Sequence, residues 1–409
     1  MALSRTTFMA AAALLAAHAP LHAQTRPRAT PAAAPADDRF AALDDRFRAL
    51  VDEGKLAGIV TLVAQHGRVR HTQAYGVQDV GTRTPVRADT IWRIASMTKP
   101  VTGVAMMILY EQGKWKLDDP VARFVPEFRG LQVKMPDGTL VPQVHPMTMR
   151  ELMSHTAGFA AAGGAELRES DLQGMIEKLA RMPLATQPGS DWVYGPSVDI
   201  QGYIVEKLSG QRLDRFMQDR IFAPLGMVDT QFWVDPAKLA RLSSLHTYNE
   251  AGKLVVADAA PRPSTAPPRF LAGGGGLYST APDYLRFARM LLGRGTLDGK
   301  RILKPETVAL MQRNVLRPGI KVDLYGPSMD GIGFGLDLAV ILDPAAAKTP
   351  QSRGSYYWGG AFGTWFWIDP SRDLIMIGMI QNVNGSIPGR GTPSLRPIAY
   401  PLVYQAIAQ

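Results

Sequence analysis

The sequence of 409 residues contains no cysteine, which excludes disulfide bonds, thiolate metal ligands and a cysteine nucleophile. Histidines are few, and those beyond the N-terminal segment show no H-E-x-x-H or other metal-ligand spacing; they are His66, His71, His145, His155 and His246. The chain also lacks G-x-S-x-G and G-x-x-x-x-G-K-[ST] motifs. These absences argue against a metallohydrolase, an α/β-hydrolase and a phosphate-loop protein.

Long basic runs are missing as well. The chain carries 45 Lys and Arg against 36 Asp and Glu, a formal net charge of +9 at pH 7, but its basic residues are scattered. Nucleic-acid interfaces gather Lys and Arg on one face or in one run, so the pattern predicts a solvated basic surface and no nucleic-acid partner. With 46% hydrophobic and 20% charged residues, the composition is typical of a soluble globular protein with a large core.

The N-terminal segment has the pattern of a secretory signal peptide. Arg5 precedes an apolar run over residues 8–17, which is too short to span a bilayer, and small residues follow. We expect a signal peptide over residues 1–23, with cleavage after either Ala19 or Ala23, then a Pro/Ala-rich linker over 24–37. The protein is therefore expected to be periplasmic or secreted, without membrane insertion.

The hydrophobic periodicity predicts an α+β fold. An apolar stripe of helical spacing begins the folded part at residue 38; it consists of Phe40, Leu43, Phe47, Leu50 and Val51. Strands are predicted near both ends of the chain, over residues 58–65 and 68–75 and then over 334–342, 355–368 and 374–381. Turns are expected at 66–67 and 369–372.

Helical signals and loops fill the stretch between these strands. We therefore expect one antiparallel sheet, built from both terminal regions and flanked by helices, with a mostly helical region inserted. In this interpretation the sheet part spans about 38–95 and 314–409, and the helical part about 96–313 of one domain over 38–409. The glycine run Gly273 to Gly276 fits no phosphate-loop pattern, and it predicts a close backbone approach or a flexible loop.

Ser96 and Lys99 form the only S-x-x-K pair in the chain. Residues three apart share one face of a helix, so a helix beginning near Ser96 brings the lysine amine toward the serine hydroxyl. Pro100 supports a first helical turn at this point, and Gly113 ends the pattern. The helix dipole and free N–H groups there favour an oxyanion. The alternative is a serine that only caps a helix.

Three further segments accompany this pair. They are Leu152 to Phe159 (LMSHTAGF), Asp191 to Ser197 (DWVYGPS) and Tyr357 to Ala361 (YWGGA). Together with residues 92–102, and in this order, they resemble the motifs of the serine β-lactamase and penicillin-binding-protein superfamily, most closely its esterase branch, the family VIII carboxylesterases. The resemblance runs from about Phe40 to Ala406. It implies the β-lactamase-like fold and a serine carboxylesterase that hydrolyses short-chain esters without a cofactor or metal.

The resemblance also assigns roles. It implies that Ser96 is the nucleophile, that Lys99 is its general-base partner and that Tyr194 shares proton transfer with the lysine, while which of the two is the base stays open. It places the oxyanion hole at the backbone N–H groups of Ser96 and Ala361. The substrate-binding strand edge is expected at Trp358, Gly359 and Gly360. His155 matches a family motif but is expected to be structural.

Two departures from the lactamase pattern bear on the substrate. The K-T-G triad is replaced by Trp358-Gly359-Gly360, which removes a cation that would hold a lactam carboxylate. The asparagine of Y-x-N is replaced by Pro196, which has no side-chain amide, and Ser197 would substitute only in part. Both changes favour a small-molecule ester as substrate. β-Lactamase, D-aminopeptidase or other amide hydrolase, and acyltransferase activities on the same site stay as alternatives, as does a non-catalytic binding protein. The oligomeric state is not predicted.

Overall fold

The computed structural model describes residues 38–160, 167, 170–257, 262–324, 329–383 and 392–408. All of them belong to one of the two compact units into which the chain divides. The predicted signal peptide over residues 1–23 and the linker over 24–37 lie outside the described residues. Export and the domain boundaries therefore stay predictions.

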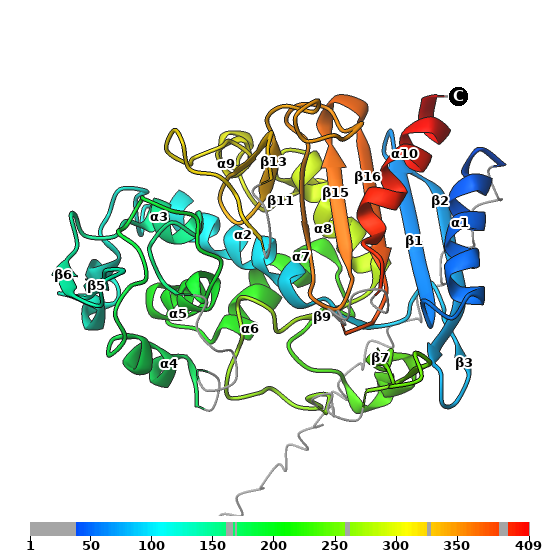
Figure 1. The fold of residues 1–409 in the computed structure, drawn as a ribbon, viewed down its shortest axis with the longest axis horizontal. Coiled ribbons are helices and arrows are strands. Elements are labelled where there is room, and N and C mark those ends of the chain that lie inside the picture. The colour runs from blue at the N-terminus through cyan, green and yellow to red at the C-terminus, as the bar shows by residue number, and fades with distance from the viewer. Residues whose placement is uncertain are drawn as a thin grey trace, which may run out of the picture. The chain divides into compact units, whose positions relative to one another are not determined.

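An eight-stranded antiparallel sheet joins the two ends of the folded chain (Figure 1). In spatial order its strands are β12 (Ile332–Phe334), β13 (Ala339–Ile341), β14 (Tyr356–Gly359), β15 (Trp365–Asp369), β16 (Leu374–Met379), β1 (Gly58–Gln65), β2 (Arg68–Asp79) and β3 (Thr84–Pro85). The central pairing sets Val60 of β1 opposite Met379 of β16. The predicted sheet from both terminal regions is confirmed.

Helices cover both faces of this sheet. The α-helices of the described residues are α1 (Ala41–Asp52), α2 (Thr98–Glu111), α3 (Met149–Met153), α4 (Leu172–Leu179), α5 (Ser197–Ser209), α6 (Leu213–Met217), α7 (Ala223–Leu225), α8 (Ala281–Leu292), α9 (Pro305–Met311) and α10 (Leu395–Ala408). α1 and α10 pack together on one face, and α8 packs against β16 and β1 (Figure 1). α8 thus covers the sheet although it lies within the stretch 96–313.

The two-residue period of β15 shows how the sheet is buried on both sides. Trp367 packs against Tyr400 of α10, with ring centroids 4.9 Å apart. The next residue toward the N-terminus, Phe366, points to the other face and packs against Tyr284 of α8 at 5.0 Å. Successive side chains of a strand alternate between the faces, so a strand with helices on both sides is apolar throughout. β15 is buried from its first residue to its last.

Most of the predicted sheet elements are confirmed, and two need correction. The strands predicted over 58–65, 68–75 and 374–381 correspond to β1, β2 and β16, and the predicted first helix corresponds to α1. The range 334–342 is not one strand, because Asp337 adopts a left-handed conformation (φ 61°) between β12 and β13. The range 355–368 is likewise a hairpin, since Gly363 (φ 90°) lies in a turn between β14 and β15.

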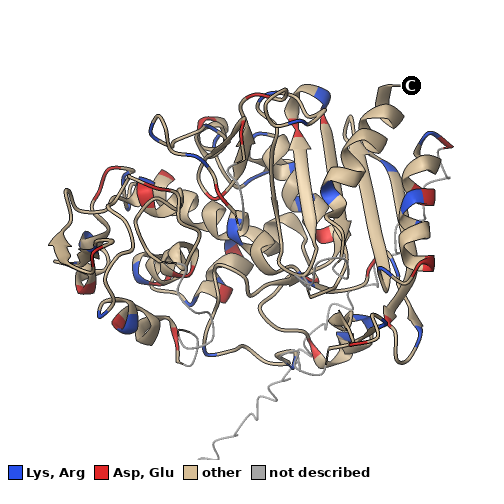
Figure 2. Ribbon diagram, in the orientation of Figure 1, with Lys and Arg blue, Asp and Glu red and all other residues tan. Residues whose placement is uncertain are grey.

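The remaining described strands form small pairs outside the main sheet. They are β4 (Trp92–Arg93) with β9 (Tyr278–Ser279), β5 (Gln132–Lys134) with β6 (Leu140–Pro142), β7 (His246–Tyr248) with β8 (Leu254–Val256), and β10 (Thr296–Leu297) with β11 (Lys300–Arg301). Basic and acidic residues are interspersed along the ribbon rather than gathered on one element (Figure 2). No helix within the described ranges is both long and apolar enough to cross a membrane.

Candidate active site

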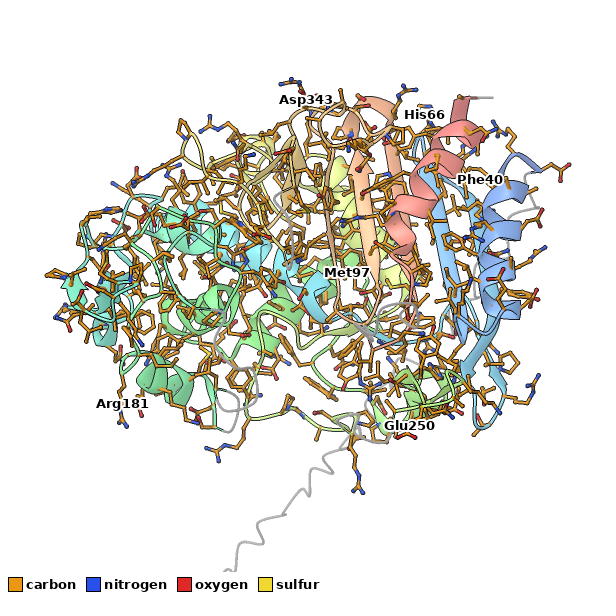
Figure 3. All side chains as sticks on the ribbon, in the orientation of Figure 1. Phe40, His66, Met97, Arg181, Glu250 and Asp343 are labelled. Atoms are coloured by element: carbon orange, nitrogen blue, oxygen red, sulfur yellow. The ribbon has the colours of Figure 1, made fainter. Side chains whose placement is uncertain are left out.

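Ser96 lies in a sharp turn between a strand and a long buried helix. The chain leaves β4, passes through the short 3-10 helix η2 (Ala95–Met97) and enters α2 at Thr98. Ala95 has φ 43°, a conformation that costs energy for any residue with a side chain, and it fixes the direction in which Ser96 leaves the turn. Met97, labelled in Figure 3, marks this point at the start of α2.

Helix α2 is buried on all sides rather than along one stripe. Every residue from Thr98 to Leu109 is buried, since the helix runs through the interior between the sheet and the helical region (Figure 1). A helix that is apolar around its whole circumference packs against neighbours in every direction. The first turn of α2, which carries Lys99, is therefore enclosed by packed neighbours.

Lys99 connects Ser96 to the glycine run. Its Nζ lies 3.1 Å from Ser96 Oγ and 2.6 Å from the carbonyl oxygen of Gly274, and the residue is only 5% exposed. The predicted helical spacing does bring the amine to the hydroxyl. The Gly274 carbonyl takes one N–H of the amine, so the amine is oriented toward Ser96 by a fixed backbone group.

The glycine run is a close backbone approach, as one of the two interpretations predicted. The carbonyl of Gly273 accepts a hydrogen bond from Thr102 Oγ1 at 2.7 Å, and the N–H of Gly274 donates to Asp199 Oδ1 at 2.8 Å. A Cβ on Gly273 would lie 2.7 Å from the Val198 carbonyl oxygen, a distance that packed atoms do not tolerate. Asp199 thus holds the backbone N–H of Gly274, the residue whose carbonyl orients Lys99, and the sequence did not predict this role.

The ring of Tyr194 packs over the amine of Lys99. Its ring centroid is 4.6 Å from Lys99 Nζ, close enough for a cation–π contact when the amine is protonated. The ring packs against His155 at 4.8 Å and Trp358 at 5.6 Å. A backbone hydrogen bond of 2.8 Å from the Val193 N–H to the His155 carbonyl holds this loop in place. Tyr194, which is distant in the sequence, is therefore brought together with the neighbouring pair Ser96 and Lys99.

His155 is a neutral packing residue behind Tyr194. It is fully buried, and within the described part of the chain neither ring nitrogen has a hydrogen-bond partner. Burial, and secondly the charge of Lys99, hold the pKa of His155 well below its ordinary value. Its ring centroid lies 5.5 Å from that of Phe334. The imidazole carries no charge at neutral pH, which agrees with the structural role expected for it.

The turn after β14 is attached to the segment before Ser96. The Gly360 N–H donates to the Thr364 carbonyl at 2.7 Å, and Thr364 Oγ1 donates to the Ile94 carbonyl at 3.1 Å. A Cβ on Gly360 would lie 2.3 Å from that same carbonyl oxygen, so only glycine fits. Ala361 follows directly and is exposed. This packing brings the turn that carries the Ala361 N–H up to the segment that carries the Ser96 N–H.

Trp358 is more buried than a substrate-facing aromatic residue would be. It is 3% exposed, and its ring packs against Tyr194 and against Phe334, 5.4 Å away. Strand β13 pairs with β14 only at Tyr356 and Tyr357, so the edge beyond Tyr357 is not covered by β13. That free edge is the segment predicted to bind substrate. Ser197, considered for the missing amide, is 1% exposed at the start of α5.

The wall behind α2 contains an acid that the sequence did not reveal. Asp337 is fully buried, and its Oδ1 accepts a hydrogen bond of 3.0 Å from Gln201 Nε2. Its Oδ2 lies 2.8 Å from the position of a Cβ on Gly103, one helical turn beyond Lys99. In the described part of the chain, Asp337 Oδ2 and Gln201 Oε1 both lack a donor. A proton on the Asp337 carboxyl group supplies one of the missing hydrogen-bond donors. Burial raises the pKa of Asp337 to about 8, against the opposing effects of Gln201 and Lys99.

We expect Asp337→Asn to remove a pH dependence of stability. An unfolded aspartate titrates near pH 4, so between about pH 4 and pH 8 the folded protein holds a proton that the unfolded chain has lost. The wild-type free energy of unfolding should therefore fall relative to the variant as the pH rises, by on the order of 4 kcal/mol from pH 5 to pH 8. Urea unfolding at both pH values measures the difference. Asp45→Asn, an exposed site on α1, is the control, and parallel curves for wild type and Asp337→Asn would contradict a raised pKa.

Comparison with known proteins shows which family the chain resembles. A sequence model of the Beta-lactamase family matches residues 43–392. The chain belongs to the Beta-lactamase family. In Mycobacterium tuberculosis, Protein Rv1367c is 37% identical over 84% of this chain and 92% of its own length. Esterase EstB of Burkholderia gladioli is 32% identical over 85% of this chain and 92% of its own length. The solved structure of EstCE1, a hydrolase with promiscuous acyltransferase activity, has a TM-score of 0.73 and 27% identity, and the match covers 91% of this chain and 98% of that one.

The family match confirms the resemblance and the β-lactamase-like fold predicted from the motifs. Over the residues that the structure describes, no group of three or more His, Asp and Glu side chains is placed to hold a metal ion.

Proposed function

We propose that this Beta-lactamase family enzyme is a serine carboxylesterase, which hydrolyses short-chain carboxylic esters through an acyl-enzyme on Ser96. The observation that carries the proposal is the position of Lys99 Nζ, 3.1 Å from Ser96 Oγ and 2.6 Å from the Gly274 carbonyl. Family membership and the relative named as an esterase support the wider class, a serine hydrolase that acts on esters by hydrolysis or acyl transfer.

The acylation step begins with proton transfer from Ser96. When the amine of Lys99 is neutral, one N–H donates to the Gly274 carbonyl, and the nitrogen lone pair can accept the hydroxyl proton. Ser96 Oγ then attacks the ester carbonyl carbon, and the carbonyl oxygen becomes an oxyanion. The N–H groups of Ser96 and Ala361 would donate to this oxygen. Its collapse breaks the bond to the alcohol oxygen, which takes a proton from Lys99 or Tyr194.

Deacylation repeats the same steps with another nucleophile. Water gives up a proton to the base, attacks the acyl carbon and releases the acid, with the Ser96 oxygen regaining its proton. An alcohol in place of water gives a new ester, so acyl transfer is the second candidate function. The structural similarity to EstCE1, described as having promiscuous acyltransferase activity, favours keeping it.

Neutral esters suit the site better than β-lactams do. Trp358 fills the position of the lactamase lysine, and its ring is buried against Tyr194, so no side-chain cation reaches the site from that position. A lactam carboxylate close to the reacting carbonyl would lose its water without gaining a partner, which is costly in a cleft of low dielectric. Pro196 likewise offers no amide to the substrate.

We therefore expect ester hydrolysis to exceed lactam hydrolysis by at least about a hundredfold in kcat/KM, the size of effect that loss of one charge-assisted contact gives in a desolvated site. The test measures p-nitrophenyl butyrate and nitrocefin on the same preparation, followed by a series of longer acyl chains for chain-length preference. If nitrocefin is the better substrate, the carboxylesterase proposal fails and β-lactamase becomes the leading function.

A further inference from the structure

A polar cavity of about 380 Å³ lies beside α3, in the helical part of the molecule (Figure 1). Its described lining does not include Ser96, Lys99 or Tyr194. The lining does include charged and hydroxyl side chains from three separate segments of the chain, namely Asp118, Arg150, Glu151, Ser154, Thr156 and Arg317. The cavity is therefore separate from the esterase site, and the chemistry at Ser96 uses none of these side chains.

Two arginines line this cavity. Arg150 donates to Asp118 Oδ1 from Nη2 at 2.8 Å and from Nε at 3.1 Å. Arg317 donates from Nη2 to Glu151 Oε1 at 2.9 Å. A guanidinium carries five N–H groups in a rigid fork, so these contacts leave N–H groups of both arginines for a ligand. Guanidinium groups are well matched in shape and charge to the oxygens of phosphate.

The two acids that line the cavity compete little for such a ligand. Glu151 is 5% exposed, and its carboxylate already accepts hydrogen bonds from the backbone N–H and hydroxyl of Thr148 and from Arg317, and contacts His145 Nε2 at 2.9 Å. The side chain of Asp118 is 77% exposed, so water and salt screen much of its charge. The donors that remain in the cavity therefore suit an anion.

Two buried hydroxyl groups connect the cavity with the wall of the esterase site. Ser154 is 1% exposed and Thr156 is 3% exposed, and their hydroxyl oxygens lie 2.9 Å apart. His155 lies between them in the chain, and its ring packs against Tyr194 at 4.8 Å. The Thr156 carbonyl also accepts the Gly189 N–H at 2.7 Å, before the loop that leads to Tyr194. A ligand that touches these hydroxyls would therefore act on the backbone that positions Tyr194.

We propose that this cavity is an effector site that binds the phosphate group of a small molecule. A phosphate has enough oxygens to accept from two guanidinium groups and a hydroxyl at once, whereas a carboxylate has only two. A volume of about 380 Å³ is within the range of small-molecule sites, so it has room for the group that carries the phosphate. Binding does not depend on the proposed esterase function, and only its effect on ester hydrolysis does.

The test uses inorganic phosphate, which carries the recognised group alone. Calorimetric titration of the wild type, at an ionic strength fixed with sodium chloride, should give a Kd on the order of 1 mM or lower. Arg317→Gln and Arg150→Gln should each weaken binding about tenfold or more, because each removes charge-assisted donors. Arg215→Gln, a change of an exposed arginine of α6 that pairs with Asp219, is the control and should bind phosphate as the wild type does.

Kinetics then test the effector role. Phosphate at a concentration that saturates the wild type should change its kcat for p-nitrophenyl butyrate at least about twofold, with a much smaller change in Arg317→Gln. A wild type that binds no phosphate overturns the site, and so does equal binding by both cavity variants, because the phosphate then lies elsewhere on the basic surface. Binding without a change in kcat overturns the effector role. If the wild type hydrolyses no ester, the esterase proposal fails, and the calorimetry still decides whether the cavity binds phosphate.

Discussion

Replacing Ser96 with alanine is expected to abolish ester hydrolysis, with a fall in kcat of roughly 10⁴-fold to 10⁶-fold, the range found when a serine nucleophile is removed. Alanine has no hydroxyl on which an acyl-enzyme can form, and the chain has no other S-x-x-K pair that could replace Ser96. The change removes one hydroxyl at the start of α2, so the fold should survive. Steady-state hydrolysis of p-nitrophenyl butyrate measures the loss, and thermal unfolding checks the fold.

Covalent trapping gives an independent result for the same residue. A fluorophosphonate should add its mass to the tryptic peptide that contains Ser96, and the Ser96→Ala protein should stay unlabelled. Ser209→Ala, at the end of α5, serves as the matched control and should keep wild-type activity and labelling. Label on a different serine would remove Ser96 from the mechanism, and a wild type that takes no label would favour a binding protein without an activated serine.

The sequence predicted the parts of the fold whose signals are local. The apolar spacing of Phe47 and its neighbours gave α1, and the turn at His66 and Gly67, both with positive φ, gave the β1–β2 hairpin. Two predicted strands were hairpins instead. The turn at Asp337 was missed because this residue takes a left-handed conformation inside an apolar run. The hydrophobic pattern of such a run predicts a single continuous strand.

Three of the site residues could be predicted because their spacing or motif was visible. Ser96 and Lys99 share one face at the start of a helix, and the motif around Tyr194 predicted that this tyrosine lies beside them. The structure agrees, since Lys99 Nζ lies 3.1 Å from Ser96 Oγ and 4.6 Å from the centroid of the Tyr194 ring. Their catalytic roles stay predictions until the variants are measured. The supporting groups had no such signal. Asp199 reaches the site through a contact between distant segments, which a single sequence does not record.

Lys99→Met and Tyr194→Phe should each lower kcat by several orders of magnitude, and the double variant should lose little more than the worse of the two. Both side chains meet at one place, since the Tyr194 ring lies 4.6 Å from Lys99 Nζ and that amine lies 3.1 Å from Ser96 Oγ. When two groups move the same proton, removing either one stops the transfer. The effects of the two substitutions on the activation free energy are then far from additive. Pre-steady-state acylation and steady-state kcat on p-nitrophenyl butyrate measure both singles and the double.

The two alternatives for the general base give different results in this experiment. If Lys99 alone takes the proton, Tyr194→Phe keeps most of the acylation rate, because the phenylalanine ring still packs against His155 and Trp358. Tyr248→Phe, a substitution on β7 of a hydroxyl that bonds the Lys55 carbonyl, is the matched control and should keep full activity. Losses that simply multiply in the double variant would contradict a shared proton-transfer unit, since independent groups contribute additively to the activation free energy.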